Sequence, residues 1–183
     1  MPRILLFSVV LLIAGCGGDP EPLPVVDEVD LERYTGTWRE IARLPQWFQR
    51  GCYNATAEYR LNDDGSLKVI NRCDKVDEKP SRAEGRARVV EGSNNARLKV
   101  RFDNWFSNLF PTIAEGNYWI IHLSEDYDVV MIGEPTRDYL WILARESELP
   151  DARYEKLVAK AEGLGFPVDE LKRNRNLVPA DGS

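Results

Sequence analysis

Residues 35–43 read TGTWREIAR, and from Gly36 and Trp38 onward this stretch begins a series of alternating segments. Alternation of apolar and polar residues is typical of a β-strand with one buried face. A tryptophan at this position can fill the bottom of a closed sheet, while Gly36 leaves room for a short helix to cross beneath it. Arg145, near the end of the last such segment, can cover the indole by a cation–π contact. We expect these three residues to close one end of a barrel.

The segments that follow have the same character and are separated by turns rich in Gly, Asn, Asp and Pro. The predicted strands are 37–44, 53–61, 66–73, 83–90, 97–102, 118–123, 129–132 and 139–144. Short strands at hairpin spacing predict an all-β fold, an eight-stranded antiparallel up-and-down β-barrel. After Pro150, apolar residues recur at helical spacing, which predicts one C-terminal α-helix packed on the barrel exterior.

Two of these segments resemble known family motifs. Residues 35–43 resemble the G-x-W motif that opens the first strand of lipocalins, and residues 134–145, EPTRDYLWILAR, resemble the last-strand signature of bacterial lipocalins. The resemblance extends over about residues 30–175, although Arg39 stands where the family usually has an aromatic residue. It implies a lipocalin domain over 31–183, in which Gly36, Trp38 and Arg145 form the structural motif. It also implies a lysophospholipid or fatty acid ligand.

The N-terminus has the pattern of an export signal. Arg3 precedes an apolar run over residues 4–13, which is shorter than the roughly 18 to 20 residues that span a bilayer, so we predict a signal peptide over 1–15. Residues 12–16, LIAGC, resemble a bacterial lipobox, which implies acylation of Cys16 and a lipid anchor. Because Gly17 follows in place of aspartate, the resemblance implies the outer membrane, with the domain facing the periplasm. The alternative is a secreted protein with an incidental cysteine.

Residues 16–30 are rich in Pro, Gly and acidic residues and show no apolar period, so we expect a lipidated N-terminus followed by a flexible linker. The whole chain has 24 basic and 30 acidic residues, a net charge of −6 that argues against nucleic-acid binding. One histidine and three cysteines are too few for metal centres built from several such ligands, and we expect no metal and no cofactor.

Side-chain parity along the strands predicts which residues face the barrel interior. With Trp38 inward, Glu40 and Ala42 are also expected to be inward, as is Val129 together with Met131. Small residues such as Ala55, Ala57 and Ala83 favour a cavity over the alternative of a filled core. The predicted ligand-binding residues are Ala57, Tyr59, Val69, Val100, Phe102, Trp105, Phe106, Tyr118, Ile120, Met131, Tyr139 and Trp141.

Aromatic residues outside the strands indicate where the barrel opens. Residues 103–111, DNWFSNLFP, are expected to border the mouth together with Trp47 and Phe48. The alternative for this loop is that it folds down as a local core. An apolar rim could also contact a membrane or a second subunit, so a homodimer is one arrangement to consider.

Cys52 and Cys73 flank the predicted turn at 62–65 almost symmetrically, and in an exported protein this spacing predicts a disulfide. Strand pairing that places Tyr59 beside Leu67 leaves Cys52 on the opposite face, so a bulge near Gly51 is expected.

Three functions remain open from the sequence. A carrier would bind lipid without chemistry, an enzyme would need acid or base groups such as Glu40 with Tyr139 or His122, and a structural envelope protein would have a filled barrel. His122 itself is either a rim group for a phosphate or carboxylate, or a strand-end histidine satisfied by hydrogen bonds. The carrier is the predicted function.

Overall fold

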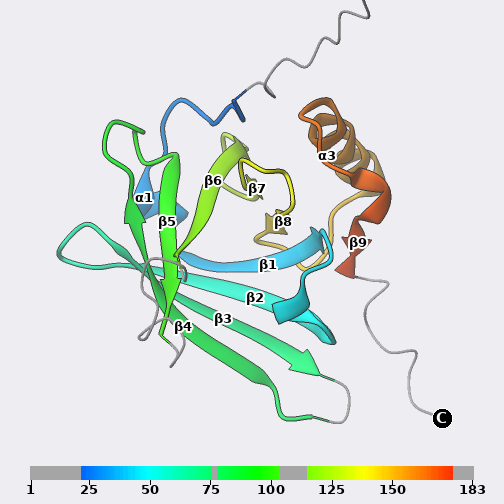
Figure 1. Cartoon of the computed structure of the whole chain (residues 1–183), viewed down its shortest axis with the longest axis horizontal. Helices are drawn as coiled ribbons and strands as arrows, with labels where there is room; N and C mark the ends of the chain where they lie inside the picture. Colours follow the sequence, from blue (N-terminus) through cyan, green and yellow to red (C-terminus); the bar gives the residue numbers. More distant parts are fainter. Residues whose placement is uncertain (1–21, 76–77, 104–114, 175–183) are drawn as a thin grey trace, which may run out of the picture.

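A computed structural model describes residues 22–75, 78–103 and 115–174. Its sheet closes because β1 (Gly36–Arg43) pairs antiparallel with both the second and the eighth strand (Figure 1). The other barrel strands are β2 (Cys52–Leu61), β3 (Leu67–Lys75), β4 (Ser81–Val89), β5 (Arg97–Phe102), β6 (Glu115–Leu123), β7 (Val129–Gly133) and β8 (Leu140–Ala144). Neighbours in sequence are neighbours in the sheet, which confirms the predicted eight-stranded up-and-down barrel.

Short helices and one helix of 13 residues complete the fold. They are α1 (Leu31–Tyr34), η1 (Trp47–Gln49), α3 (Asp151–Gly163) and η2 (Val168–Glu170), followed by the two-residue strand β9 (Lys172–Arg173). Figure 1 shows α3 outside the barrel, which confirms the predicted C-terminal helix. Within the ranges given above, no helix is long and apolar enough to cross a membrane.

One end of the barrel, here called the closed end, is sealed by α1 and Trp38. The Asp30 carboxylate caps α1 by accepting hydrogen bonds from its first backbone N–H groups. This helix delivers Tyr34 beneath the barrel, and the Trp38 indole N–H donates to the Tyr34 carbonyl at 2.9 Å. Both side chains are fully buried, so the floor of the barrel is solid.

Arg145 holds this floor in place. Its guanidinium carbon lies 3.8 Å from the centre of the Trp38 ring. The same guanidinium donates to four backbone carbonyls, those of Arg33, Tyr34, Thr37 and Tyr127. Gly36 has φ +94°, and a Cβ there would lie 3.2 Å from Arg145 Nη1, so glycine suits both the backbone and the close approach.

The sheet separates two apolar cores. The inner core fills the barrel near its closed end and includes Trp38, Tyr59, Leu98 and Ile132. The outer core lies between α3 and the outer faces of β1, β6, β7 and β8, and Leu157 and Ala161 are the buried residues of the helix. Strands β7 and β8 are therefore covered on both faces, whereas β4 alternates between buried and exposed residues.

Two register shifts change the predicted facing of side chains. One lies between Glu40 and Ala42 in β1, and the other lies in the pairing of β6 with β7. Ala42 consequently belongs to the outer core. Val129 and Met131 also belong to it, because β7 is apolar on both faces and alternation does not tell which face points inward. The predicted inward placement of all three residues is wrong. A shift by one residue moves every following side chain to the other face of a strand, and periodicity alone does not reveal it.

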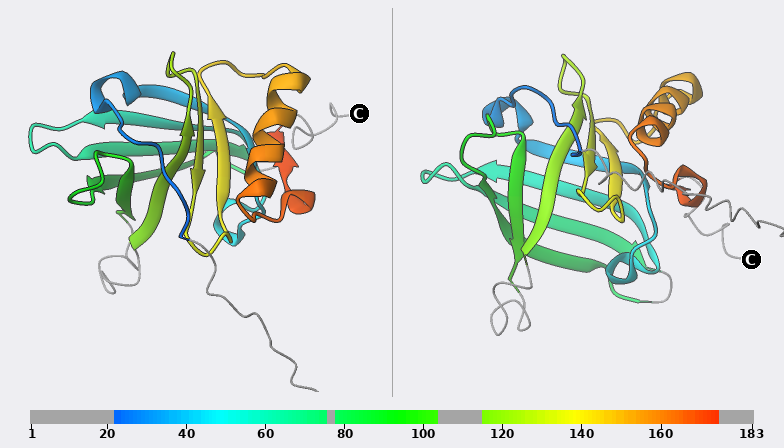
Figure 2. Two further views of the ribbon diagram at one scale, coloured as in Figure 1. Left: turned by 90° about the horizontal axis from the view of Figure 1, so that it is seen from above. Right: turned by 45° about the horizontal axis from the view of Figure 1, so that its top comes forward.

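The predicted flexible linker is wrong for residues 22–30. Leu23 and Val29 are buried, the Val26 N–H donates to the Ile120 carbonyl at 2.9 Å, and the Val29 N–H donates to the Asn94 carbonyl at 3.0 Å. This segment, the N-terminal strap, therefore lies against the barrel wall. In Figure 2 it begins near the β7–β8 connection and crosses to α1 at the closed end. Residues 1–21, including the predicted signal peptide and Cys16, lie outside the described residues.

The predicted disulfide joins Cys52 of β2 to Cys73 of β3, with a Cα–Cα distance of 5.4 Å. The bulge that it requires lies between Tyr53 and Thr56, not at Gly51 as predicted. Asn54 accommodates this bulge with φ +48°. The bulge turns Cys52 to the face that also carries Ala55 and Cys73, and the three side chains form a small buried cluster.

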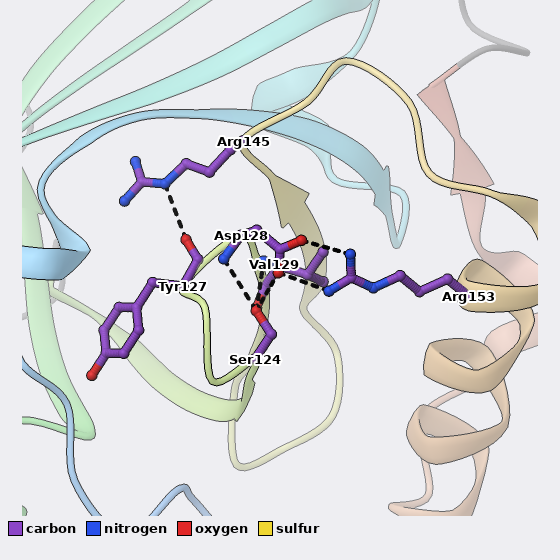
Figure 3. A network of polar contacts seen from close by, with 6 residues as sticks. All are labelled: Ser124, Tyr127, Asp128, Val129, Arg145 and Arg153. Carbon is purple, nitrogen blue, oxygen red and sulfur yellow. Dashed lines mark hydrogen bonds and ion pairs between the residues drawn. The ribbon is translucent and has the colours of Figure 1, made fainter.

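A polar network fixes α3 to the turn between β6 and β7 (Figure 3). Arg153 of α3 binds the Asp128 carboxylate through both terminal nitrogens, at 2.6 and 2.7 Å. The Ser124 hydroxyl also donates to Asp128 and accepts the backbone N–H groups of Asp128 and Val129. The hydrogen bonds from Arg153, with a smaller effect from Ser124, lower the pKa of Asp128 to about 2.

Replacing Arg145→Met tests the closed end. The variant removes the cation–π contact and leaves backbone carbonyls without a donor, so we expect a loss of about 2 to 3 kcal/mol in the free energy of unfolding. Urea unfolding measures this loss. Arg39→Met is the matched control, because Arg39 lies on β1 beside Trp38 but is exposed. Equal losses in the two variants would contradict the assigned role of Arg145.

Asp128→Asn tests the attachment of α3. The pair is partly exposed, so we expect a loss of only about 1 kcal/mol. Because the folded-state pKa of Asp128 is below its unfolded value of about 3.9, the stabilisation is present above about pH 4 and is lost as the pH falls towards about 2. Urea unfolding over this pH range should show the difference shrinking with acid. Glu125→Gln, on the same turn, should leave the unfolding free energy nearly unchanged.

Candidate functional site

The barrel interior changes character along its length. Near the closed end the inward residues Leu67, Val69, Ala87 and Leu98 are buried. Towards the opposite end the inward positions of the same sheet remain partly or fully accessible to solvent. These positions are Ala57, Asn71, Ala83, Phe102 and Trp141. The accessible end is here called the mouth, and it carries η1 and the β7–β8 connection.

Three tyrosines form the boundary between floor and interior. The hydroxyl oxygen of Tyr118 lies 2.6 Å from that of Tyr34 and 2.9 Å from that of Tyr59. Burial raises the pKa of Tyr59 to about 12 and also raises the pKa values of Tyr34 and Tyr118 well above the usual value, so all three hydroxyls remain protonated at neutral pH. Tyr59 and Tyr118, predicted to bind ligand, are thus paired with each other at the base of the interior.

Small side chains surround a polar group halfway along the barrel. Asn71 of β3 pairs with Ala57 on one side and with Ala83 on the other. Its Oδ1 atom is buried and has no hydrogen-bond partner within the described parts of the chain. Burying an unpaired acceptor costs about 1 to 3 kcal/mol. This position therefore favours a ligand that supplies a hydrogen-bond donor.

Phe102 narrows the interior on the β4–β5 side. A Cβ added at Gly85 would lie 2.9 Å from the Phe102 ring, so this ring lies directly over the glycine. Val100 and Ile120 belong to the inner core beneath it. The aromatic ring and the aliphatic floor give the middle of the barrel an apolar wall that suits an acyl chain.

A buried ion pair lies nearer the mouth. Glu40 and Arg43 of β1 are both buried and hydrogen-bonded to each other. Gln49 of η1 donates to Glu40 at 3.0 Å and accepts from the Trp141 indole N–H at 3.0 Å, while Arg43 also donates to the Cys52 carbonyl. Burial raises the pKa of the Glu40 carboxyl, and the hydrogen bonds and positive charge from Arg43 and Gln49 oppose this rise.

An aromatic series leads from the surface into the barrel. Trp47, which is 83% exposed, contacts the edge of Phe48, and the Phe48 ring lies 6.0 Å from Tyr139. Tyr139 stacks on Trp141 at 6.2 Å between ring centres. The exposed rim at η1 is therefore continuous with the interior of the barrel.

The other sequence predictions have different outcomes. Trp105, Phe106 and most of the 103–111 loop lie outside the described residues. His122 lies on the outer side of the sheet, with Nδ1 3.4 Å from the Lys160 amine of α3. Burial and the neighbouring cations Lys160 and Arg153 lower its pKa. The structure thus separates His122 from Glu40, so the two do not form one acid–base site.

Sequence reasoning missed Asn71, Arg43 and Gln49. Asn71 shares its parity with Val69, so alternation along β3 places it inward. Arg43 lies beyond the bulge in β1, and Gln49 lies outside the strands, so strand periodicity indicated neither. A surface hollow of about 450 Å³ also lies outside the closed end, but its lining includes Glu32, Glu58 and Arg60, which suit an acyl chain poorly.

Comparison with known proteins agrees with this architecture. The Lipocalin-like domain family matches residues 29–176. The chain is 35% identical to the outer membrane lipoprotein Blc of Citrobacter freundii, over 93% of this chain and 94% of that protein. It is 33% identical to temperature-induced lipocalin-1 of Arabidopsis thaliana, over 85% and 83% of the two chains.

The fold is also found among solved structures. Insecticyanin of Manduca sexta superposes with a TM-score of 0.64 at 17% identity, over 85% of this chain and 84% of the other. Lipocalins are in general binding proteins and not enzymes. With the family match, the similarity to Blc and a barrel closed at one end, this chain belongs to the lipocalin family and is a hydrophobic-ligand-binding lipocalin.

Proposed function

We propose that this chain is a carrier of lysophospholipid or fatty acid, anchored in the outer membrane by acylated Cys16 with its barrel in the periplasm. The observation that carries the proposal is that the inward residues are buried at the closed end and become accessible to solvent towards the mouth. The floor is solid, whereas Ala57 and Ala83 are small and the interior remains accessible towards the mouth. An acyl chain entering there would meet Phe102 and Val100, and its polar head would remain nearer Glu40 and Arg43.

The unpaired acceptor of Asn71 favours lysophospholipid within this ligand class. A lysophospholipid carries a glycerol hydroxyl that can donate a hydrogen bond to Oδ1, whereas an ionised fatty acid has acceptors only. A monoacyl lipid also places one chain in the space that a single barrel interior provides. We therefore expect lysophospholipid to bind more tightly than fatty acid.

The anchor is supported by sequence and by similarity. Residues 12–16 resemble a lipobox, and the related Blc proteins of Citrobacter freundii and Vibrio cholerae are described as outer membrane lipoproteins. Two or more acyl chains on the cysteine would make such an anchor stable, because each buried CH₂ contributes about 0.8 kcal/mol.

A carrier explains the buried carboxylate better than an enzyme does. Glu40 is hydrogen-bonded to Arg43 and Gln49, so both of its oxygens have partners. A general acid or base needs a free lone pair or proton within reach of substrate. We assign Glu40 a positioning role: it orders Gln49, which in turn orients the Trp141 indole.

Filling the interior tests ligand binding. Ala57→Phe adds a ring where Asn71 and Trp38 are the strand partners, and we expect the affinity for lysophosphatidylethanolamine to fall at least about tenfold, or 1.4 kcal/mol. Native mass spectrometry and tryptophan fluorescence measure binding. Thr56→Phe is the matched control, because Thr56 is the preceding residue of β2 and pairs with Arg39 and Arg72 on the outer face. Unchanged affinity in Ala57→Phe, or no binding by the wild type, would contradict the proposal.

The raised pKa of Glu40 predicts a specific pH dependence. Because the folded state holds this proton more tightly than the unfolded state, Glu40 contributes stability at low pH that is lost as the pH rises through its folded pKa. As the pH rises above about 4, the wild type should therefore lose unfolding free energy relative to Glu40→Gln.

The control for this experiment has the opposite sign. Hydrogen bonds from Arg72 and Arg60 lower the pKa of Glu58, so the wild type should gain stability relative to Glu58→Gln as the pH rises towards the ordinary carboxyl range, and the gain should be complete above that range. Urea unfolding at several pH values measures both differences. If Glu40→Gln keeps the lipid affinity of the wild type, the carboxylate is not needed for binding. If the wild type converts lipid and Glu40→Gln does not, the protein is an enzyme and not a carrier.

A further inference from the structure

The N-terminal strap determines which end of the barrel lies nearer the proposed lipid anchor. Leu23, at its start, lies beside Gly133 at the mouth end of β7, where a Cβ on the glycine would be 3.3 Å from Leu23 Cδ2. The Val26 backbone N–H donates to the Ile120 carbonyl halfway along β6, and the Asp30 backbone N–H donates to the Tyr127 hydroxyl at the closed end. The strap therefore runs the height of the barrel from mouth to floor, as Figure 2 shows.

The chain between the predicted anchor and the strap is short. Six residue steps separate Cys16 from Pro22, which is at most roughly 20 Å of extended chain. Strand β2 has 10 residues and measures roughly 30 Å at about 3.3 Å per residue. An acyl group on Cys16 would therefore keep the mouth end within reach of the bilayer surface, while the closed end would be held farther away.

The surface at the mouth end has the side chains that a lipid surface would bind. Trp47 and Phe48 are 83% and 50% exposed, and they continue through Tyr139 into the barrel. Exposed aromatic residues of this kind favour the interface between lipid headgroups and acyl chains. Gln49 ties η1 to Glu40 and Trp141, so the aromatic pair projects from a fixed position.

We propose that the barrel stands with its mouth towards the membrane, with Trp47, Phe48 and Tyr139 in contact with the bilayer surface. The inference rests on the acylation of Cys16 proposed above and adds an orientation and a contact surface. Lipid then passes between the bilayer and the barrel along the aromatic series without crossing open water. Because the contact is made by aromatic side chains, the docking should change little with salt.

The test uses the full-length acylated chain in vesicles of phosphatidylethanolamine and phosphatidylglycerol that contain phospholipid brominated on its acyl chains. Bromine quenches tryptophan only where the indole reaches the bilayer. We expect the wild type to lose emission relative to the same vesicles without bromine, and Trp47→Phe to lose measurably less. Trp47→Phe keeps an aromatic side chain at an exposed position, so the variant should fold.

The closed end supplies the matched control. Leu61, which is 40% exposed, lies at the opposite end of β2, and Leu61→Trp in the Trp47→Phe background places a tryptophan there. This tryptophan should add emission that bromine does not quench. Quenching of the tryptophan at position 61 without quenching of Trp47 would overturn the orientation. The absence of quenching at both positions would overturn it as well.

Two further outcomes separate this inference from the proposals on which it rests. If the chain fails to float with the vesicles, the anchor itself is wrong, and the orientation fails with it. If the chain floats and binds lysophospholipid but Trp47 is buried between two copies, shown by a sedimenting dimer and an unquenched Trp47, then a second copy and not the bilayer covers the rim. In that case the orientation alone is overturned.

Discussion

The contact between Arg145 and Trp38 is the constraint on which the barrel depends. Trp38 lies in the first strand and Arg145 directly follows the eighth, and the guanidinium also binds carbonyls of the segment that contains α1. A sheet closes only if its first and last strands pair in one register. Because the Arg145 guanidinium contacts both the Trp38 ring and the backbone that precedes β1, it fixes that register at the closed end. The rest of the interior is then free to be small, polar or accessible, because the floor does not depend on it.

Much of this architecture could be predicted from the sequence, because it follows from period and composition. Along β3 to β5, and along β2 after its bulge, inward residues that are mostly small or apolar alternate with outward residues that are mostly charged. The inward placement of Val69, Val100 and Phe102 therefore follows from parity. The structural motif of Gly36, Trp38 and Arg145 likewise predicted that one end of the barrel is closed. The disulfide was also predictable, since two cysteines placed symmetrically about a turn lie on adjacent strands.

The remainder depended on features that leave no periodic signal. The shift in β1 moves Ala42 to the outer core, and Met131 was placed wrongly because both faces of β7 are equally apolar. Leu23 and Val29 are separated by five residues among prolines and acids, so nothing in their spacing indicated that both are buried. The partners of Glu40 come from beyond a bulge and from η1, and only the folded chain brings them together.

The unequal cover of the sheet has a consequence for motion. Strands β7 and β8 lie between two cores, whereas the outer faces of β3 and β4 carry exposed charged residues joined by pairs such as Lys68 with Glu84. Local opening of a protein costs least where few apolar contacts must be broken. Amide hydrogens of β3 and β4 should therefore exchange with solvent well before those of β7 and β8. Strands β3 and β4 can therefore move to admit an acyl chain, while β7 and β8, which α3 covers, stay in place.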